Sequence, residues 1–209
     1  ALKMKENTAD VNHPLASPAR SPRVILAGDV GATKTLVGVF DATAARPKAV
    51  RVQAFQTAAF SGLQTLLAAF FADGQAQPST VSAAAFGVAG PVLGATAELT
   101  NVPFTIDAAG ITRAFGISRV KLLNDLEAMA FGVPVLEGTE LHVLQPGAAL
   151  PAGNMALIAA GTGLGQALLH RVDGRLVPSP SEAGHADWAA RTDRDIVILR
   201  SLVSRYGRR

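Results

Sequence analysis

The sequence predicts an α/β protein built from two lobes. Short apolar runs typical of buried strands alternate along the chain with segments whose apolar residues recur at helical spacing. Two glycine-rich turns, at residues 29–34 and 160–165, each join one predicted strand to the next. Small residues in such turns let the backbone approach an anion closely, so the pair predicts a nucleotide held between two lobes.

The first three predicted strands lie at residues 24–27, 35–40 and 49–56. The first two are apolar runs joined by the turn at 29–34, and the third alternates apolar and polar residues. Residues 60–72 follow with the spacing of an amphipathic helix. Its apolar side consists of Leu63, Leu66, Leu67, Phe70 and Phe71.

The central part of the chain repeats the alternation of strand and helix. Residues 81–88 are apolar or glycine except for Ser82 and are closed by an Ala-Gly-Pro turn, which predicts a fully buried strand. Residues 106–115 fit a helix, and residues 120–123 fit a second buried strand. A further helix covers 125–131 and is cut short by a following proline.

The C-terminal part begins with a hairpin, whose strands at 155–160 and 166–171 flank the second glycine-rich turn. A helix at 193–206 follows, because Ile196, Leu199, Val203 and Tyr206 recur on one face.

Three segments organise the chain. We expect residues 1–22, which end in Ser-Pro-Ala-Arg-Ser-Pro, to be a flexible leader. Residues 23–123 are expected to form a smaller N-terminal lobe, and residues 124–209 the start of a larger C-terminal lobe.

Composition favours a globular cytoplasmic protein. Apolar residues make up 49% of the 209, there is no cysteine, and no apolar stretch is long enough to span a bilayer. The formal charge of +3 comes from the ends, since residues 24–190 hold nine basic and twelve acidic side chains. This distribution argues against a nucleic-acid-binding face, and the absence of an apolar signal core argues against secretion.

Six short motifs occur in a fixed order: DVGATKT at 29–35, GVAGPV at 87–92, LTNVP at 99–103, LLNDLEA at 122–128, AAGTGLG at 159–165 and SEAGHAD at 181–187. Together they resemble bacterial glucokinases, a family of actin-like, ribonuclease-H-like sugar kinases. The resemblance implies the actin-like ATPase fold with an incomplete second lobe. It also implies ATP-dependent phosphorylation of glucose, or a close hexose, at the entry step of glycolysis.

The resemblance assigns roles to particular residues. Asp125 would be the base that accepts the proton of the attacking hydroxyl. The sugar would contact Asn101, Asn124, Glu182 and His185. Mg-ATP would be held by Asp29, Gly31, Ala32, Thr33, Lys34, Gly161, Thr162 and Gly163, with Asp29 binding Mg²⁺ through water.

Plainer interpretations stay open from position alone. Asp125 fits a helix N-cap, Asn101 a turn before a proline, and each glycine-rich turn an ordinary hairpin. Glu182 and His185 fit a loop carboxylate and a capped histidine. Four histidines at scattered positions make a metal site at His185 the weaker interpretation.

The chain departs from the family pattern at three places. Ala32 and Ala183 stand where the family usually has glycine, which is unfavourable if either site needs a positive φ. The chain also ends where family members continue, so we expect a C-terminal truncation that leaves the apolar face of 193–206 exposed. The alternative function is a catalytically inactive sugar-binding remnant. A sugar-responsive repressor is disfavoured, and a homodimer stays open.

Overall fold

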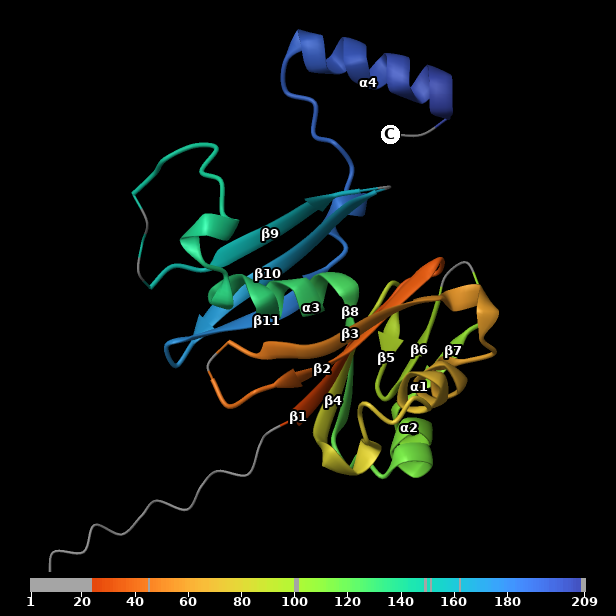
Figure 1. Cartoon of the computed structure of the whole chain (residues 1–209). Coiled ribbons are helices and arrows are strands. Elements are labelled where there is room, and N and C mark those ends of the chain that lie inside the picture. The colour runs from red at the N-terminus through yellow and green to blue at the C-terminus, as the bar shows by residue number, and fades with distance from the viewer. Residues whose placement is uncertain are drawn as a thin grey trace, which may run out of the picture.

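The computed structural model describes residues 24–44, 46–99, 102–148, 150, 152–161 and 163–207, so the predicted leader lies outside it. Figure 1 shows a five-stranded sheet with helices α1 and α2 on one side, and a separate three-stranded sheet beside helix α3. Helix α4 stands apart from both sheets.

The five-stranded sheet has the order β3-β2-β1-β4-β8. Strands β1, β2 and β3 are antiparallel neighbours, whereas β4 is parallel to β1 and β8 is parallel to β4. The carboxyl ends of β1, β4 and β8 therefore meet at one sheet edge. The bounds are β1 (Val24–Val30), β2 (Lys34–Asp41), β3 (Lys48–Gln56), β4 (Val81–Val88) and β8 (Val120–Asn124).

The first strand is longer than the sequence predicted. It continues through Asp29 to Val30, which is fully buried, and leaves residues 31–33 as the turn. The physical reason is pairing, because Asp29 and Val30 have ladder partners in both β2 and β4. Asp29 thus belongs to the paired end of a strand rather than to the turn itself.

Helices α1 (Leu63–Phe71) and α2 (Ala108–Phe115) cover one face of this sheet. All five predicted apolar residues of α1 are buried in the core, which confirms that side of the helix. Helix α2 begins two residues later than predicted, because Asp107 caps it. The Asp107 carboxylate accepts the backbone N–H groups of Ala109 and Gly110 at 2.9 and 3.0 Å.

A small antiparallel sheet that the sequence did not predict lies between β4 and α2 in the chain. Its strands are β5 (Val92–Leu93), β6 (Thr96–Glu98) and β7 (Thr105–Asp107), paired in that order. Ile106, predicted to start a helix, is a buried residue of β7.

The second large element is an antiparallel sheet with the order β11-β10-β9, made of β9 (Met155–Ala160), β10 (Leu164–Val172) and β11 (Arg175–Ser181). The predicted hairpin at 155–171 is confirmed, and β11 is an addition. Helix α3 (Asp125–Gly132) packs on this sheet through a small core of Ala130, Ala167 and Leu169.

The last helix, α4 (Asp193–Tyr206), has the predicted bounds. The Thr192 hydroxyl and the Asp195 carboxylate form a capping box at its start, and Gly207 ends it at a φ of 66°. None of its residues is buried, and Val203 keeps 45% of its surface exposed. The expected exposure of this apolar face is therefore observed.

Short 3₁₀ turns complete the described chain, at Thr57–Ala59, Pro78–Thr80, Val133–Val135, Gly138–Glu140 and Ala183–His185. Among the residues that the structure describes, no helix is long and apolar enough to cross a bilayer.

Candidate active site

Asn124 and Asp125 lie where β8 ends and α3 begins. The Asn124 Oδ1 atom accepts the Leu126 N–H at 3.0 Å and caps the helix, so the cap predicted as an alternative for Asp125 belongs to its neighbour. One oxygen of Asp125 shares that N–H at 2.8 Å. Among the described residues, neither the Asn124 amide nitrogen nor the second Asp125 oxygen has a hydrogen-bond partner. Both can therefore serve a ligand.

A glycine in β4 sets the position of this helix on the sheet. A Cβ atom added to Gly87 would lie 2.9 Å from the Ala128 Cβ and 3.8 Å from the Asp125 Cα. The missing side chain thus lets the first turns of α3 lie against the sheet face opposite α1 and α2. Asp29 pairs with Gly87 across β1 and β4. Because the start of α3 lies against Gly87, Asp125 lies near Asp29.

The charge of Asp125 and the burial of the strand end both affect the pKa of Asp29. Desolvation at the strand end raises the pKa of Asp29 above its ordinary value, and the negative charge of Asp125 raises it further. A divalent cation between such groups would relieve this repulsion, and carboxylate oxygens are ligands that Mg²⁺ accepts. The pair therefore fits a magnesium ion, although no cluster of three metal-ligating side chains occurs among the described residues.

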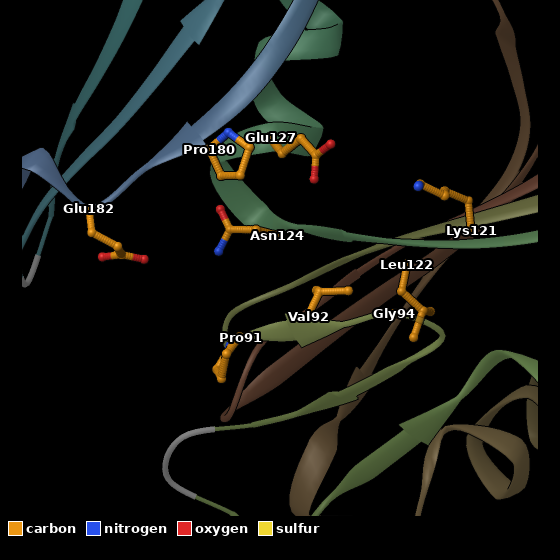
Figure 2. A pocket seen from close by; sticks show the side chains of 9 residues that line it. All are labelled: Pro91, Val92, Gly94, Lys121, Leu122, Asn124, Glu127, Pro180 and Glu182. Atoms are coloured by element: carbon orange, nitrogen blue, oxygen red, sulfur yellow. The ribbon is translucent and has the colours of Figure 1, made fainter.

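Two adjoining pockets lie beside α3. The smaller, of about 200 Å³, is lined by Asn124, Asp125, Glu182 and His185 together with residues 163–166 at the start of β10. The larger, of about 450 Å³, shares Asn124, Pro180 and Glu182 and is large enough for a small ligand. Figure 2 shows Asn124 between Glu182, which follows β11, and Glu127 of α3. The structure thus brings five of the predicted site residues to the smaller pocket: Asn124, Asp125, Gly163, Glu182 and His185.

The turn that carries Glu182 and His185 is held close to β10 by Gly184. A Cβ atom added there would overlap the Leu164 carbonyl oxygen, so only glycine permits this approach. The His185 Nε2 atom lies 3.7 Å from a Glu182 oxygen, and both side chains are more than four-fifths exposed. They are available to a ligand rather than tied into the fold.

The glycine-rich turns are closed by their own backbone. Gly31 N–H donates to the Lys34 carbonyl at 3.2 Å, and Gly161 N–H donates to the Gly163 carbonyl at 2.9 Å. Gly163 lines the smaller pocket, whereas no described residue of 31–34 lines either pocket. The predicted site residues Asn101 and Thr162 lie outside the described residues.

The two alanines that we expected to replace glycines of the family pattern do not strain the backbone. Asp173 is the one non-glycine residue with a positive φ among those the structure describes, so Ala32 and Ala183 adopt ordinary conformations. The conformational cost considered from the sequence does not arise at either position.

Sequence reasoning missed two charged residues that line the larger pocket, Lys121 of β8 and Glu127 of α3. Both side chains extend into the open space in Figure 2. A signal was present, since Lys121 is a lone charge in an apolar strand and Glu127 lies two residues after Asp125.

Known proteins resemble this chain along most of its length. A family model described as Glucokinase matches residues 26–209. Glucokinase from Nostoc punctiforme is 32% identical over 184 residues, which are 88% of this chain and 53% of the relative. Glucokinase from Synechocystis is 32% identical over 190 residues, or 87% of this chain and 54% of the relative. The chain thus spans about half the length of these curated relatives.

Solved structures agree with this assignment. The crystal structure of glucokinase from an Antarctic psychrotroph superimposes with a TM-score of 0.78 at 28% identity, over 88% of this chain and 58% of that one. A Balamuthia mandrillaris glucokinase in complex with glucose gives a TM-score of 0.63 at 18% identity, over 88% and 56%, which shows the shared fold alone. The α/β architecture is the actin-like ATPase fold of sugar kinases, and the chain belongs to the glucokinase family.

Proposed function

We propose that this chain carries a glucokinase site, at which the γ-phosphoryl group of ATP is transferred to the 6-hydroxyl of glucose. One observation carries the proposal: Asn124 and Asp125 of one motif and Glu182 and His185 of another line the same pocket. Asp125 also lies near enough to Asp29 for its charge to act on that carboxyl. We further propose that the lobes divide between residues 123 and 124, and that the protein acts in the cytoplasm at the first step of glycolysis.

Asp125 is the proposed general base. As the sugar oxygen attacks phosphorus, the bond from phosphorus to the ADP oxygen breaks, and the hydroxyl proton passes to the Asp125 carboxylate. The N–H of Leu126 holds one oxygen of that carboxylate and leaves the other for the hydroxyl. The proposed contribution of this residue is the position of its carboxylate beside the attacking hydroxyl.

The sugar is proposed to bind across the pocket. The Asn124 amide nitrogen would donate to one hydroxyl of the sugar. From the opposite wall, Glu182 would accept a hydrogen bond from another hydroxyl and His185 would donate one to a third. Asn101 completes the proposed set. The proposed substrate class is glucose or a close hexose.

Mg-ATP is proposed to bind at the sheet edge. Backbone N–H groups, hydroxyls and an ammonium group would bind the phosphates from two sides. These groups belong to Gly31, Ala32, Thr33 and Lys34 on one side, and to Gly161, Thr162 and Gly163 on the other. Asp29 would hold Mg²⁺ through water, and the ion would neutralise charge on the phosphates.

The test is a coupled assay with glucose and Mg-ATP, run beside a calorimetric titration with glucose. Asp125→Asn should lower kcat by about 10² to 10⁴-fold and leave the Kd for glucose unchanged. Asp173→Asn, at an exposed hairpin turn away from the pocket, is the matched control. Glucose binding without turnover in the unaltered chain would instead support the inactive sugar-binding alternative. Turnover preserved in Asp125→Asn would exclude Asp125 as the base.

A further inference from the structure

Two threonines are the buried polar residues of the described core, Thr35 of β2 and Thr57 just after β3. Both are completely inaccessible to solvent, and their hydroxyl oxygens lie 2.8 Å apart. Neither belongs to the machinery proposed above. Both lie next to the turn at 31–34.

Thr57 is bonded to this turn at two points. Its hydroxyl lies 2.7 Å from the Gly31 carbonyl oxygen, and its backbone N–H donates to the Thr33 carbonyl at 3.0 Å. A carbonyl can only accept, so the single Thr57 hydroxyl proton goes to Gly31. Thr35 must then be the donor in the bond between the two threonines.

The bond to Gly31 fixes the direction of an N–H group. In a trans peptide the C=O and the following N–H point to opposite sides, and the described chain contains no cis peptide. Because the Gly31 carbonyl points inward to Thr57, the Ala32 N–H points outward, away from the core. A backbone N–H held in this direction is what an anion-binding turn requires.

We propose that Thr57 is a positioning residue for nucleotide binding: from the core it fixes the peptide between Gly31 and Ala32, so that the Ala32 N–H faces the ATP phosphates. The proposal rests on the proposed function. The hydroxyl acts through the turn and does not touch the nucleotide itself.

Thr57→Val removes the hydroxyl and keeps the shape of the side chain. We expect the KM for Mg-ATP to rise on the order of tenfold while the KM for glucose stays unchanged, and Thr57→Ser to restore the original value. Thr35→Val should have a smaller effect, because the bond from Thr57 to Gly31 survives. Thr80→Val is the matched control, since its exposed hydroxyl also donates to a backbone carbonyl, that of Gln77, at 2.8 Å.

A second measurement keeps the inference separate from catalysis. Amide hydrogen exchange over 31–34 should accelerate in Thr57→Val, and not in Thr57→Ser or Thr80→Val, with or without nucleotide. If the unaltered chain neither binds nor uses ATP, the proposed function fails while exchange still tests the turn. Three outcomes would overturn the proposal. The first is an unchanged rate of amide exchange in Thr57→Val, and the second is an unchanged KM for Mg-ATP of that variant in an active enzyme. The third is a Thr57→Ser variant that is as impaired as Thr57→Val. If Thr57→Val does not fold, a Thr35→Val variant more impaired than Thr57→Ser would likewise overturn it.

Discussion

The contact between Gly87 and Ala128 offers a direct test of how the fold positions the Asp125 carboxylate, the proposed base. An added methyl group at residue 87 would lie 2.9 Å from the Ala128 Cβ, whereas non-bonded carbons settle at about 3.5–4.0 Å. Helix α3 must therefore shift by about 0.6 Å or more in Gly87→Ala. Overpacking of this kind costs about 1–3 kcal/mol of the free energy of unfolding. Because Asp125 begins the same helix, kcat should fall by about tenfold to a hundredfold.

Removal of the opposing methyl group makes the test specific. Ala128→Gly alone should cost about 1 kcal/mol through lower helix propensity, but in the Gly87→Ala background it should cost nothing or restore stability. Urea unfolding of the four proteins of this double-mutant cycle measures the coupling, and the coupled assay measures recovery of kcat. Gly138→Ala is the control, because nothing lies within 4 Å of its added Cβ. Additivity of the two substitutions within about 0.5 kcal/mol would refute the reasoning.

Three further outcomes follow from the described contacts. Gly184→Ala should weaken glucose binding, because the added methyl group overlaps the β10 backbone and displaces the turn that carries Glu182. Calorimetry measures this, and an unchanged Kd for glucose would contradict it. Asp29→Asn should raise the free energy of unfolding at pH 7 while lowering kcat. The reason is that the pKa of Asp29 is raised in the folded state, so its charged form destabilises that state as pH rises above 3.8. A lower free energy of unfolding in urea at pH 7 would count against this. A hydrogen bond from Arg46 chiefly lowers the pKa of Glu140 from 4.5 to about 2, so the stabilisation is present above pH 4.5 and is lost as pH falls toward 2. The stability difference between the unaltered chain and Glu140→Gln should shrink over that range in acid titrations, and a difference independent of pH would exclude the pair as its cause.

Long apolar elements could be predicted from the sequence because their patterns are self-contained. Strand β4 was predicted with its observed bounds, because it lies between two neighbouring strands and is apolar or glycine at every position except Ser82. Five of its eight residues are buried and three are half-buried, so the expectation of a fully buried strand was only partly correct. Helix α4 was also predicted with its bounds, because the periodic face is framed by a capping threonine and a terminal glycine.

The missed strands lack such local signals. Strands β5, β6 and β7 have two or three residues each, too few to display a period of two. Strand β11 contains Pro178 and Pro180, which normally argue against a strand. It is an edge strand, and residues two apart direct their backbone nitrogens to the same side, so both prolines can face away from β10.

The chemistry of the site was more predictable than its geometry. Residue types and motif order pointed to Asp125 and Glu182, but the closeness of Asp29 to Asp125 depends on a strand register and on the space left by Gly87. Thr57 carried no signal at all, because a threonine after a strand is ordinary until its two partners in the 31–34 turn are known.

Helix α3 explains why the candidate site lies where it does. Its Ala128 contacts the five-stranded sheet at Gly87, while its Ala130 belongs to the core of the three-stranded sheet. Asp125 begins this shared helix, so one element fixes the proposed base relative both to Asp29 on the first sheet and to Glu182 beyond the second. A movement of either sheet against α3 changes one of these distances, and a movement of α3 itself changes both. Correct packing of this short helix is therefore the structural condition for phosphoryl transfer at the proposed site.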